Sequence, residues 1–306
     1  MKALYFAFLV ILFFTMLLVP FLVCGTGSSA VAVSTGADSG SFAVYISSQN
    51  EIKNITAQDY VLGVLGANCD KNSPAQSIKA QAVCAYTLAL YYSEHSGDKN
   101  YDLEDIYDGY ADISSQKEKW GADYDKTVEN FKKIINEVEG QYLACNGKPI
   151  LALCHAVSSG KTENAKDILG EDLPYLVSCD SAGDLYCPTL ETKKTVPLSE
   201  LKNLMSSFGK ISDTPDLKLG KTASGAVKTV SLYGVSAKGE EIKNALSLPS
   251  LCFNITLGEK DATVTALGSG SLLGLSRYGA NYMAQKGADY TEILSNYFKN
   301  CALQKR

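Results

Sequence analysis

Apolar residues between positions 56 and 68 recur at the spacing of a helix. Thr56 precedes this pattern and Asp59 follows three residues later, a combination that predicts a capped helix start. Gly66 and the polar run at residues 68–72 are expected to end the helix. Its apolar face is formed by Tyr60, Val61, Val64 and Leu65.

A second helix is predicted directly after this polar run. Ser73 is placed as N-cap and Pro74 as the first helical residue. Small side chains repeat along the helix, so another element can approach it closely. The residues at helical spacing are Ile78, Ala82, Ala85 and Ala89.

Shorter patterns follow along the rest of the chain. Residues 42–46, 227–235 and 264–267 read as strands, and residues 123–139 and 195–208 read as helices. The dipeptide Asn146-Gly147 separates two apolar arms within residues 141–155, which predicts a hairpin. Two helices close the chain, and Asp289 with Glu292 caps the second.

The chain begins with an apolar run from Ala3 to Val23, which is long enough to cross a bilayer because crossing takes about 20 residues. The single lysine before it favours a cytoplasmic N-terminus. Its length and the lack of a small-x-small site favour an uncleaved anchor over a signal peptide. We therefore expect a single-pass cell-membrane protein with an anchor at 1–24, a flexible linker at 25–41 and a domain at 42–304 outside the cytoplasm.

Charge and cysteine content narrow the function. The formal net charge is −5, and basic and acidic residues are interleaved without a basic stripe, which argues against nucleic acid as a partner. Nine cysteines are present, but their spacing shows no compact disulfide framework; Cys179 and Cys187 are the closest pair. No CxxC motif occurs, so no zinc ribbon is predicted.

Three segments in order along the chain resemble the stage II sporulation protein D (SpoIID) family. The first is Tyr60–Val83, the second His155–Asp180 and the third Gly268–Tyr297. The resemblance covers about residues 42 to 301. It implies an α+β fold, with helices packed on mostly antiparallel sheet, and the activity of a peptidoglycan lytic transglycosylase.

The resemblance places the family's catalytic glutamate at a position where this chain has Asn68. The carboxyl would protonate the leaving sugar oxygen and then take the proton from the muramyl 6-hydroxyl, and an amide cannot exchange a proton in this way. Losing a general acid costs about 100- to 10,000-fold in rate. We therefore predict that the activity is weakened or lost.

Two other carboxylates are candidates for the acid that Asn68 cannot provide. Asp70 lies two residues along the same loop, where a turn residue is the more common role. Glu163 lies in the second motif, where a structural hydrogen-bonding role is favoured. The cysteine and histidine that hold a metal in parts of the family are replaced here within residues 105–110. We accordingly predict no metal and no cofactor.

Substrate contacts are expected from the second and third motifs. His155 reads either as a buried histidine at a strand end or as a groove residue, and we favour the groove. The third motif departs from the family at Ser271, where relatives carry histidine, and at Arg277, where they carry glutamine. The predicted contact residues are His155, Ser158, Ser159, Thr162, Ser271, Arg277 and Tyr278.

These observations favour a divergent SpoIID-like protein that binds peptidoglycan glycan strands during the wall remodelling of sporulation. The family implies a cell-wall amidase and other membrane proteins of the engulfment machinery as partners. The first alternative is an active lytic transglycosylase that uses Asp70 or Glu163 as acid. The second is a structural envelope protein that serves assembly with its partners.

Overall fold

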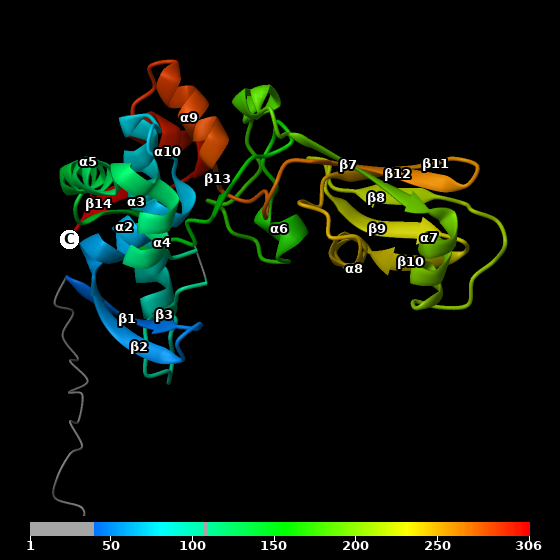
Figure 1. The fold of residues 1–306 in the computed structure, drawn as a ribbon, viewed down its shortest axis with the longest axis horizontal. Coiled ribbons are helices and arrows are strands. Elements are labelled where there is room, and N and C mark those ends of the chain that lie inside the picture. The colour runs from blue at the N-terminus through cyan, green and yellow to red at the C-terminus, as the bar shows by residue number, and fades with distance from the viewer. Residues whose placement is uncertain (1–39, 107–108) are drawn as a thin grey trace, which may run out of the picture. The chain divides into compact units, whose positions relative to one another are not determined.

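The computed structural model describes residues 40–106 and 109–306 (Figure 1). It is an α+β fold whose several sheets are mostly antiparallel, which confirms the predicted fold class. The expected anchor and all but the last residues of the linker lie outside the described residues. Among the residues that are described, no helix is both long and apolar enough to cross a bilayer.

The first predicted helix is α2 (Ala57–Asn68), and its cap is confirmed. The Thr56 hydroxyl accepts a hydrogen bond from the Asp59 backbone N–H at 3.1 Å. The helix ends at Asn68, the first residue of the predicted polar run, whereas Gly66 lies inside it and does not break it. A Cβ at position 66 would lie 2.8 Å from Cγ of Gln116, so glycine is needed here for close packing rather than as a helix stop.

The second predicted helix is α3 (Ala75–Glu94), which is buried over most of its length. Its N-cap is Pro74 and carries no side-chain cap, so the expected cap at Ser73 is wrong. The Ser73 N–H instead donates to the Asp70 carbonyl in a turn. The run of small residues lets α2, α5, α9, α10 and β4 all contact α3.

The elements around α3 form the first of two hydrophobic clusters. The predicted 42–46 strand, the 123–139 helix and the hairpin at Asn146-Gly147 are all present, and both turn residues have positive φ. Helix α4 fills a stretch for which no element was predicted. These elements are β1 (Ser41–Ile46), β2 (Glu51–Thr56), β3 (Leu103–Glu104), α4 (Ile113–Trp120), η1 (Gly121–Asp123), α5 (Tyr124–Glu137), β4 (Gln141–Cys145), β5 (Lys148–Pro149) and β14 (Ala302–Lys305).

The second hydrophobic cluster is built on two three-stranded antiparallel sheets, β11-β12-β7 and β10-β9-β8. Strand β12 alternates buried with less buried positions, as its sequence pattern predicted, and β9 does so except at the adjacent exposed residues Lys228 and Thr229. The helix predicted at 195–208 is shorter, because β7 extends to Pro197. The elements are β7 (Glu191–Pro197), α7 (Leu198–Ser206), β8 (Lys218–Lys221), β9 (Val227–Leu232), β10 (Val235–Lys238), α8 (Gly239–Ala245), β11 (Phe253–Leu257) and β12 (Asp261–Leu267).

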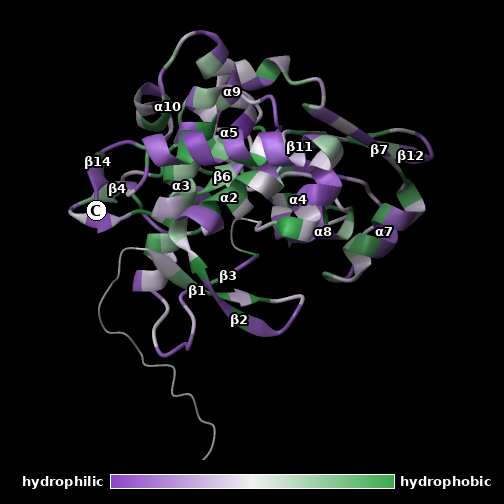
Figure 2. Ribbon diagram, turned by 60° about the vertical axis from the view of Figure 1, so that its left-hand side comes forward, coloured by the Kyte–Doolittle hydropathy of each residue, from purple (hydrophilic) through white to green (hydrophobic). Residues whose placement is uncertain are grey.

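The second and third sequence motifs meet at a short parallel pairing of β6 with β13. The predicted closing helices are α9 and α10, and Asp289 and Glu292 form the expected capping box. Figure 2 shows hydrophobic and hydrophilic residues alternating along the helices, as one-sided burial requires. The remaining elements are β6 (Cys154–His155), α6 (Ala165–Ile168), η2 (Ala182–Tyr186), β13 (Leu275–Ser276), α9 (Arg277–Gln285) and α10 (Tyr290–Tyr297).

Candidate functional site

Asn68, which the motif resemblance aligns with a catalytic acid, is the last residue of α2 and is half-buried. Its Nδ2 donates to the Val64 carbonyl at 2.9 Å and to the Gly109 carbonyl at 3.3 Å. The side chain therefore serves as a hydrogen-bond donor that ties the helix end to the following loop. A carboxylate at this position could not make these two bonds, because it has no proton to donate.

Lys119 fixes the same end of α2. Its Nζ donates to the carbonyls of Gly66, Ala67 and Cys69 at 2.9 to 3.0 Å. These carbonyls lie in the last turn of a helix, where backbone acceptors lack partners and the helix dipole favours a cation. Burial lowers the pKa of Lys119. The end of α2 is therefore fixed both by the Asn68 amide and by the Lys119 ammonium group.

Asp70 is an exposed turn residue. Its Oδ1 accepts the Asn72 N–H at 2.8 Å, and its carbonyl accepts the Ser73 N–H at 3.0 Å. This is the Asx-turn arrangement that short polar loops use.

His155 lies on β6 directly opposite Ser276 of β13 and is only 2% exposed. Its Nδ1 is 2.9 Å from the Leu273 carbonyl, and because a carbonyl can only accept, Nδ1 carries the proton. Burial lowers the pKa of His155 to about 4, so the ring is neutral near pH 7. Nε2 is buried, is left as an acceptor, and has no hydrogen-bond partner among the described residues.

The glycine-rich start of the third motif packs against this histidine. A Cβ at Gly270 would lie 3.0 Å from the His155 Cβ, and the glycine has a φ of 100°. Ser271 beside it is exposed, and its hydroxyl accepts the Leu273 N–H at 3.3 Å. Glycine at position 270 therefore allows the loop to pass close to the His155 backbone.

Asp184 holds the second and third motifs together. It is fully buried, and its Oδ2 accepts the N–H and hydroxyl of Ser158 at 2.8 and 2.5 Å. Its Oδ1 accepts the Ser276 hydroxyl at 2.7 Å. The sequence analysis missed this residue. The only signal was an aspartate in a short segment between Cys179 and Cys187, which did not reveal its burial.

The other predicted contact residues differ in their exposure. Ser159 is half-buried, whereas Thr162 is buried and its hydroxyl accepts the Cys179 N–H at 2.9 Å. Arg277 and Tyr278 are both half-buried at the start of α9. The Tyr278 hydroxyl donates to the Tyr186 carbonyl at 2.9 Å, which links α9 to η2.

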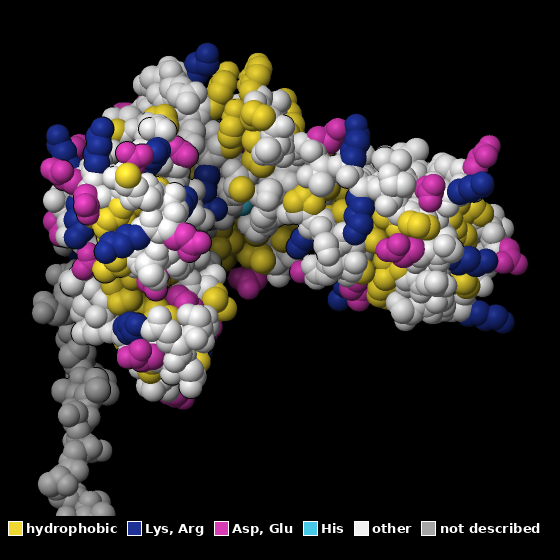
Figure 3. All heavy atoms as spheres, viewed as in Figure 1, with side chains coloured by type: hydrophobic (Ala, Val, Ile, Leu, Met, Phe, Trp, Pro, Cys, Tyr) yellow, Lys and Arg dark blue, Asp and Glu magenta, His cyan; other side chains and the backbone are white. Residues whose placement is uncertain are grey.

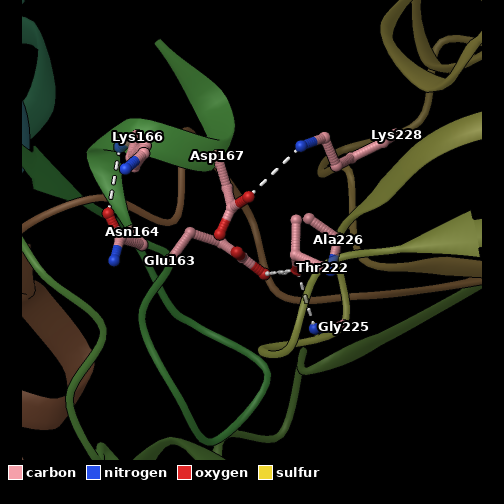
Figure 4. Close-up of polar contacts among 8 residues, drawn as sticks. All are labelled: Glu163, Asn164, Lys166, Asp167, Thr222, Gly225, Ala226 and Lys228. Carbon is pink, nitrogen blue, oxygen red and sulfur yellow. Dashed lines mark hydrogen bonds and ion pairs between the residues drawn. The ribbon is translucent and has the colours of Figure 1, made fainter. Parts of the chain in front are cut away.

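Glu163 is 1% exposed and bonds to the β8–β9 turn (Figure 4). Its Oε1 accepts the Thr222 hydroxyl at 3.0 Å and the Ala226 N–H at 2.9 Å. Oε2 has no partner among the described residues. Burial raises the pKa of the carboxyl, although these two bonds oppose the shift. Lys228 and Asp167 form an ion pair at 3.2 Å beside it.

The structure therefore joins the second and third motifs into one unit and places Asn68 at the end of a different element. Neither the cavity of about 480 Å³ nor that of about 140 Å³ is lined by Asn68, Asp70 or His155. Within the described ranges, no cluster of three or more His, Cys, Asp or Glu side chains could hold a metal. Cys179 and Cys187, the closest pair along the sequence, are both free thiols.

Comparisons with known proteins agree with the motif resemblance. The family model described as "Stage II sporulation protein" matches residues 45–144. Stage II sporulation protein D of Bacillus amyloliquefaciens is 31% identical over 265 residues, which cover 84% of this chain and 76% of the relative. The protein of the same name in Bacillus subtilis is 28% identical over 278 residues, covering 87% and 79%. The amidase enhancer of Bacillus subtilis is 25% identical over 295 residues, covering 79% and 40%.

Proposed function

Because the chain belongs to the stage II sporulation protein D family, which gives it a cell-wall-related role in sporulation, we propose that it binds peptidoglycan glycan strands and that its lytic transglycosylase activity is weakened or lost. In this proposal the apolar N-terminal run holds the domain at the outer face of the cell membrane. The amidase enhancer relative favours a cell-wall amidase as a partner.

The observation that carries the proposal is the amide of Asn68. Glycan cleavage requires a group that gives a proton to the leaving oxygen, since a sugar alkoxide leaves poorly. Asn68 cannot do this, and its Nδ2 is already committed to the Val64 and Gly109 carbonyls. The position therefore supplies no acid for cleavage, whereas wall binding does not need one.

The two carboxylates considered as replacements have other roles. Asp70 accepts a backbone N–H within its own turn and is exposed. Glu163 has the raised pKa expected of an acid, but it is 1% exposed and bonds to Thr222 and Ala226. A glycan could reach its carboxyl only if the β8–β9 turn moved away.

The test uses the full-length protein in mild detergent with purified wall sacculi. We expect the protein to sediment with the sacculi and to release no anhydromuramyl ends above the level of a protein-free control. Sedimentation without products supports the proposal. Products that disappear in Glu163→Gln or Asp70→Asn would instead establish the active enzyme, and each variant serves as the control for the other.

A second candidate function is that of a scaffold for an amidase, favoured by the amidase enhancer relative. If the protein is a scaffold, it should not sediment with amidase-treated glycan strands. It should also increase the rate at which a wall amidase from the same organism releases peptides. If the protein binds glycan strands and leaves that rate unchanged, the scaffold function is rejected.

A further inference from the structure

The cavity of about 480 Å³ is not lined by any of the site residues predicted from the three motifs. It opens between the N-terminal turn of α2, the middle of α3, the C-terminal half of α5 and the end of β14. Its volume is within the range of small-ligand sites, which is about 300 to 1,000 Å³. Its apolar wall is formed by Val61, Ala82, Ile135 and Val138.

Tyr86 lines this cavity with a hydroxyl that the protein leaves unused. The side chain is 6% exposed, and its ring packs on Phe42 at a centroid distance of 6.1 Å. Its hydroxyl makes no hydrogen bond to any residue that the structure describes. Burial raises the pKa of this hydroxyl, so the group keeps its proton and can donate. The hydroxyl oxygen is not sealed in the core, so a ligand in the cavity can reach it and accept its proton.

The rim of the cavity carries both signs of charge. Lys132 pairs with Asp59 at 3.4 Å, and Arg306 pairs with Glu94 at 3.3 Å. Glu139 and Lys305 also line the cavity, and neither has an ion-pair partner in the described part of the chain. The cavity therefore presents one uncommitted carboxylate and one uncommitted ammonium group beside the tyrosine hydroxyl. Figure 3 shows the same interspersion of acidic and basic side chains over the face in view.

The Tyr86 hydroxyl, the Glu139 carboxylate and the Lys305 ammonium group together favour one class of ligand. A neutral glycan would leave both charges unpaired, and a polyanion would meet the Glu139 carboxylate. A short peptide with a free carboxylate and a free amino group would pair with both charges and could place a backbone carbonyl on the Tyr86 hydroxyl. We propose that this cavity binds the short peptide of a peptidoglycan fragment, separately from the His155 segment. This assignment of the ligand rests on the wall-binding function proposed above.

The test measures calorimetric binding of disaccharide-tetrapeptides, purified from cell walls and bearing a side-chain amino group, to the full-length protein. Tyr86→Phe removes only the hydroxyl and should weaken binding about tenfold, the loss expected for one hydrogen bond. Lys305→Glu, at an exposed position, should weaken it as well. Tyr175→Phe is the matched control, because that hydroxyl accepts the Leu151 N–H instead of facing the cavity.

A chemical variant of the ligand tests the charge assignment independently. Glu139→Gln should weaken binding of the tetrapeptide, and acetylation of the peptide amino group should remove that difference. If Tyr86→Phe, Lys305→Glu and Glu139→Gln all bind like the wild type, the cavity is not the peptide site.

Peptide-free glycan strands separate this proposal from the function on which it rests. If the wild type binds the strands but gains nothing from the peptide, the cavity proposal fails and wall binding remains. If the wild type binds neither ligand, both proposals fail.

Discussion

The carboxylate of Asp184 accepts a 2.7 Å hydrogen bond from the hydroxyl of Ser276, which lies 92 positions further along the chain. Its other oxygen accepts two bonds from Ser158. One buried side chain therefore holds the segment after β6 against the strand that leads into α9. The placement of His155 opposite Ser276 depends on this arrangement.

The first prediction concerns this carboxylate. Asp184→Asn leaves one acceptor oxygen and directs an NH₂ group at a serine hydroxyl or backbone donor, so the free energy of unfolding should fall by about 2 to 3 kcal/mol. Denaturant titration measures this change. Asp180→Asn is the control, because the Asp180 side chain is 81% exposed and its ion pair with Lys161 is 3.5 Å long. An equal loss in both variants would contradict the role assigned to Asp184.

The second prediction concerns the protonation of His155. Burial lowers its pKa from 6.5 to about 4, so the unfolded chain binds a proton over a range where the folded protein does not. Its contribution to stability is complete above pH 6.5 and is lost as the pH falls toward 4, a total of about 3 kcal/mol. NMR of the imidazole protons should show a ring that remains neutral at pH 5. Protonation of the ring near pH 6.5 would contradict the effect assigned to burial.

The third prediction uses the opposite shift at Glu163. Because burial raises the pKa of its carboxyl above 4.5, the folded protein retains a proton that the unfolded chain has lost. This contribution is complete below pH 4.5 and declines as the pH rises through the folded-state pKa. Glu163→Gln keeps an acceptor oxygen and does not titrate. Its melting temperature should therefore rise relative to the wild type as the pH increases from 4.5 to 7, and a constant difference would contradict the shift.

The fourth prediction restores the missing acid. Asn68→Glu supplies a carboxyl at the family's catalytic position, and we expect anhydromuramyl ends at about 100-fold above the wild-type background. Asn68→Asp is the matched control, since it loses the same two amide hydrogen bonds but has a shorter side chain. Activity in neither variant would contradict the prediction that this position can hold a working acid.

The local elements were predicted well where a short-range pattern carries the signal. The Thr56 cap, the Asn146-Gly147 turn and the Asp289 capping box each depend on residues within a few positions of one another. Gly66 was taken as a helix end, yet its role comes from Gln116, which no local pattern connects to it. Tertiary packing decided the outcome at that position.

The candidate site was predicted only in part. Motif order identified the His155 and Ser276 segments, and their pairing on β6 and β13 brings them together. Asp184 escaped notice because its importance comes from burial among distant hydroxyl groups. The relation of Asn68 to these segments likewise depends on loop geometry at Gly109 and Lys119, which the sequence pattern does not encode.

The pairing of β14 with β4 has a consequence for how the protein is made. Strand Ala302–Lys305 pairs with residues 141–144 of β4, so a ribosome must synthesise the chain as far as Lys305 before this sheet can close. Until then β4 has an open edge, and nascent chains with such edges are prone to associate with one another. A truncation that removes Ala302–Lys305 should therefore yield aggregated protein, even though every motif residue is still present.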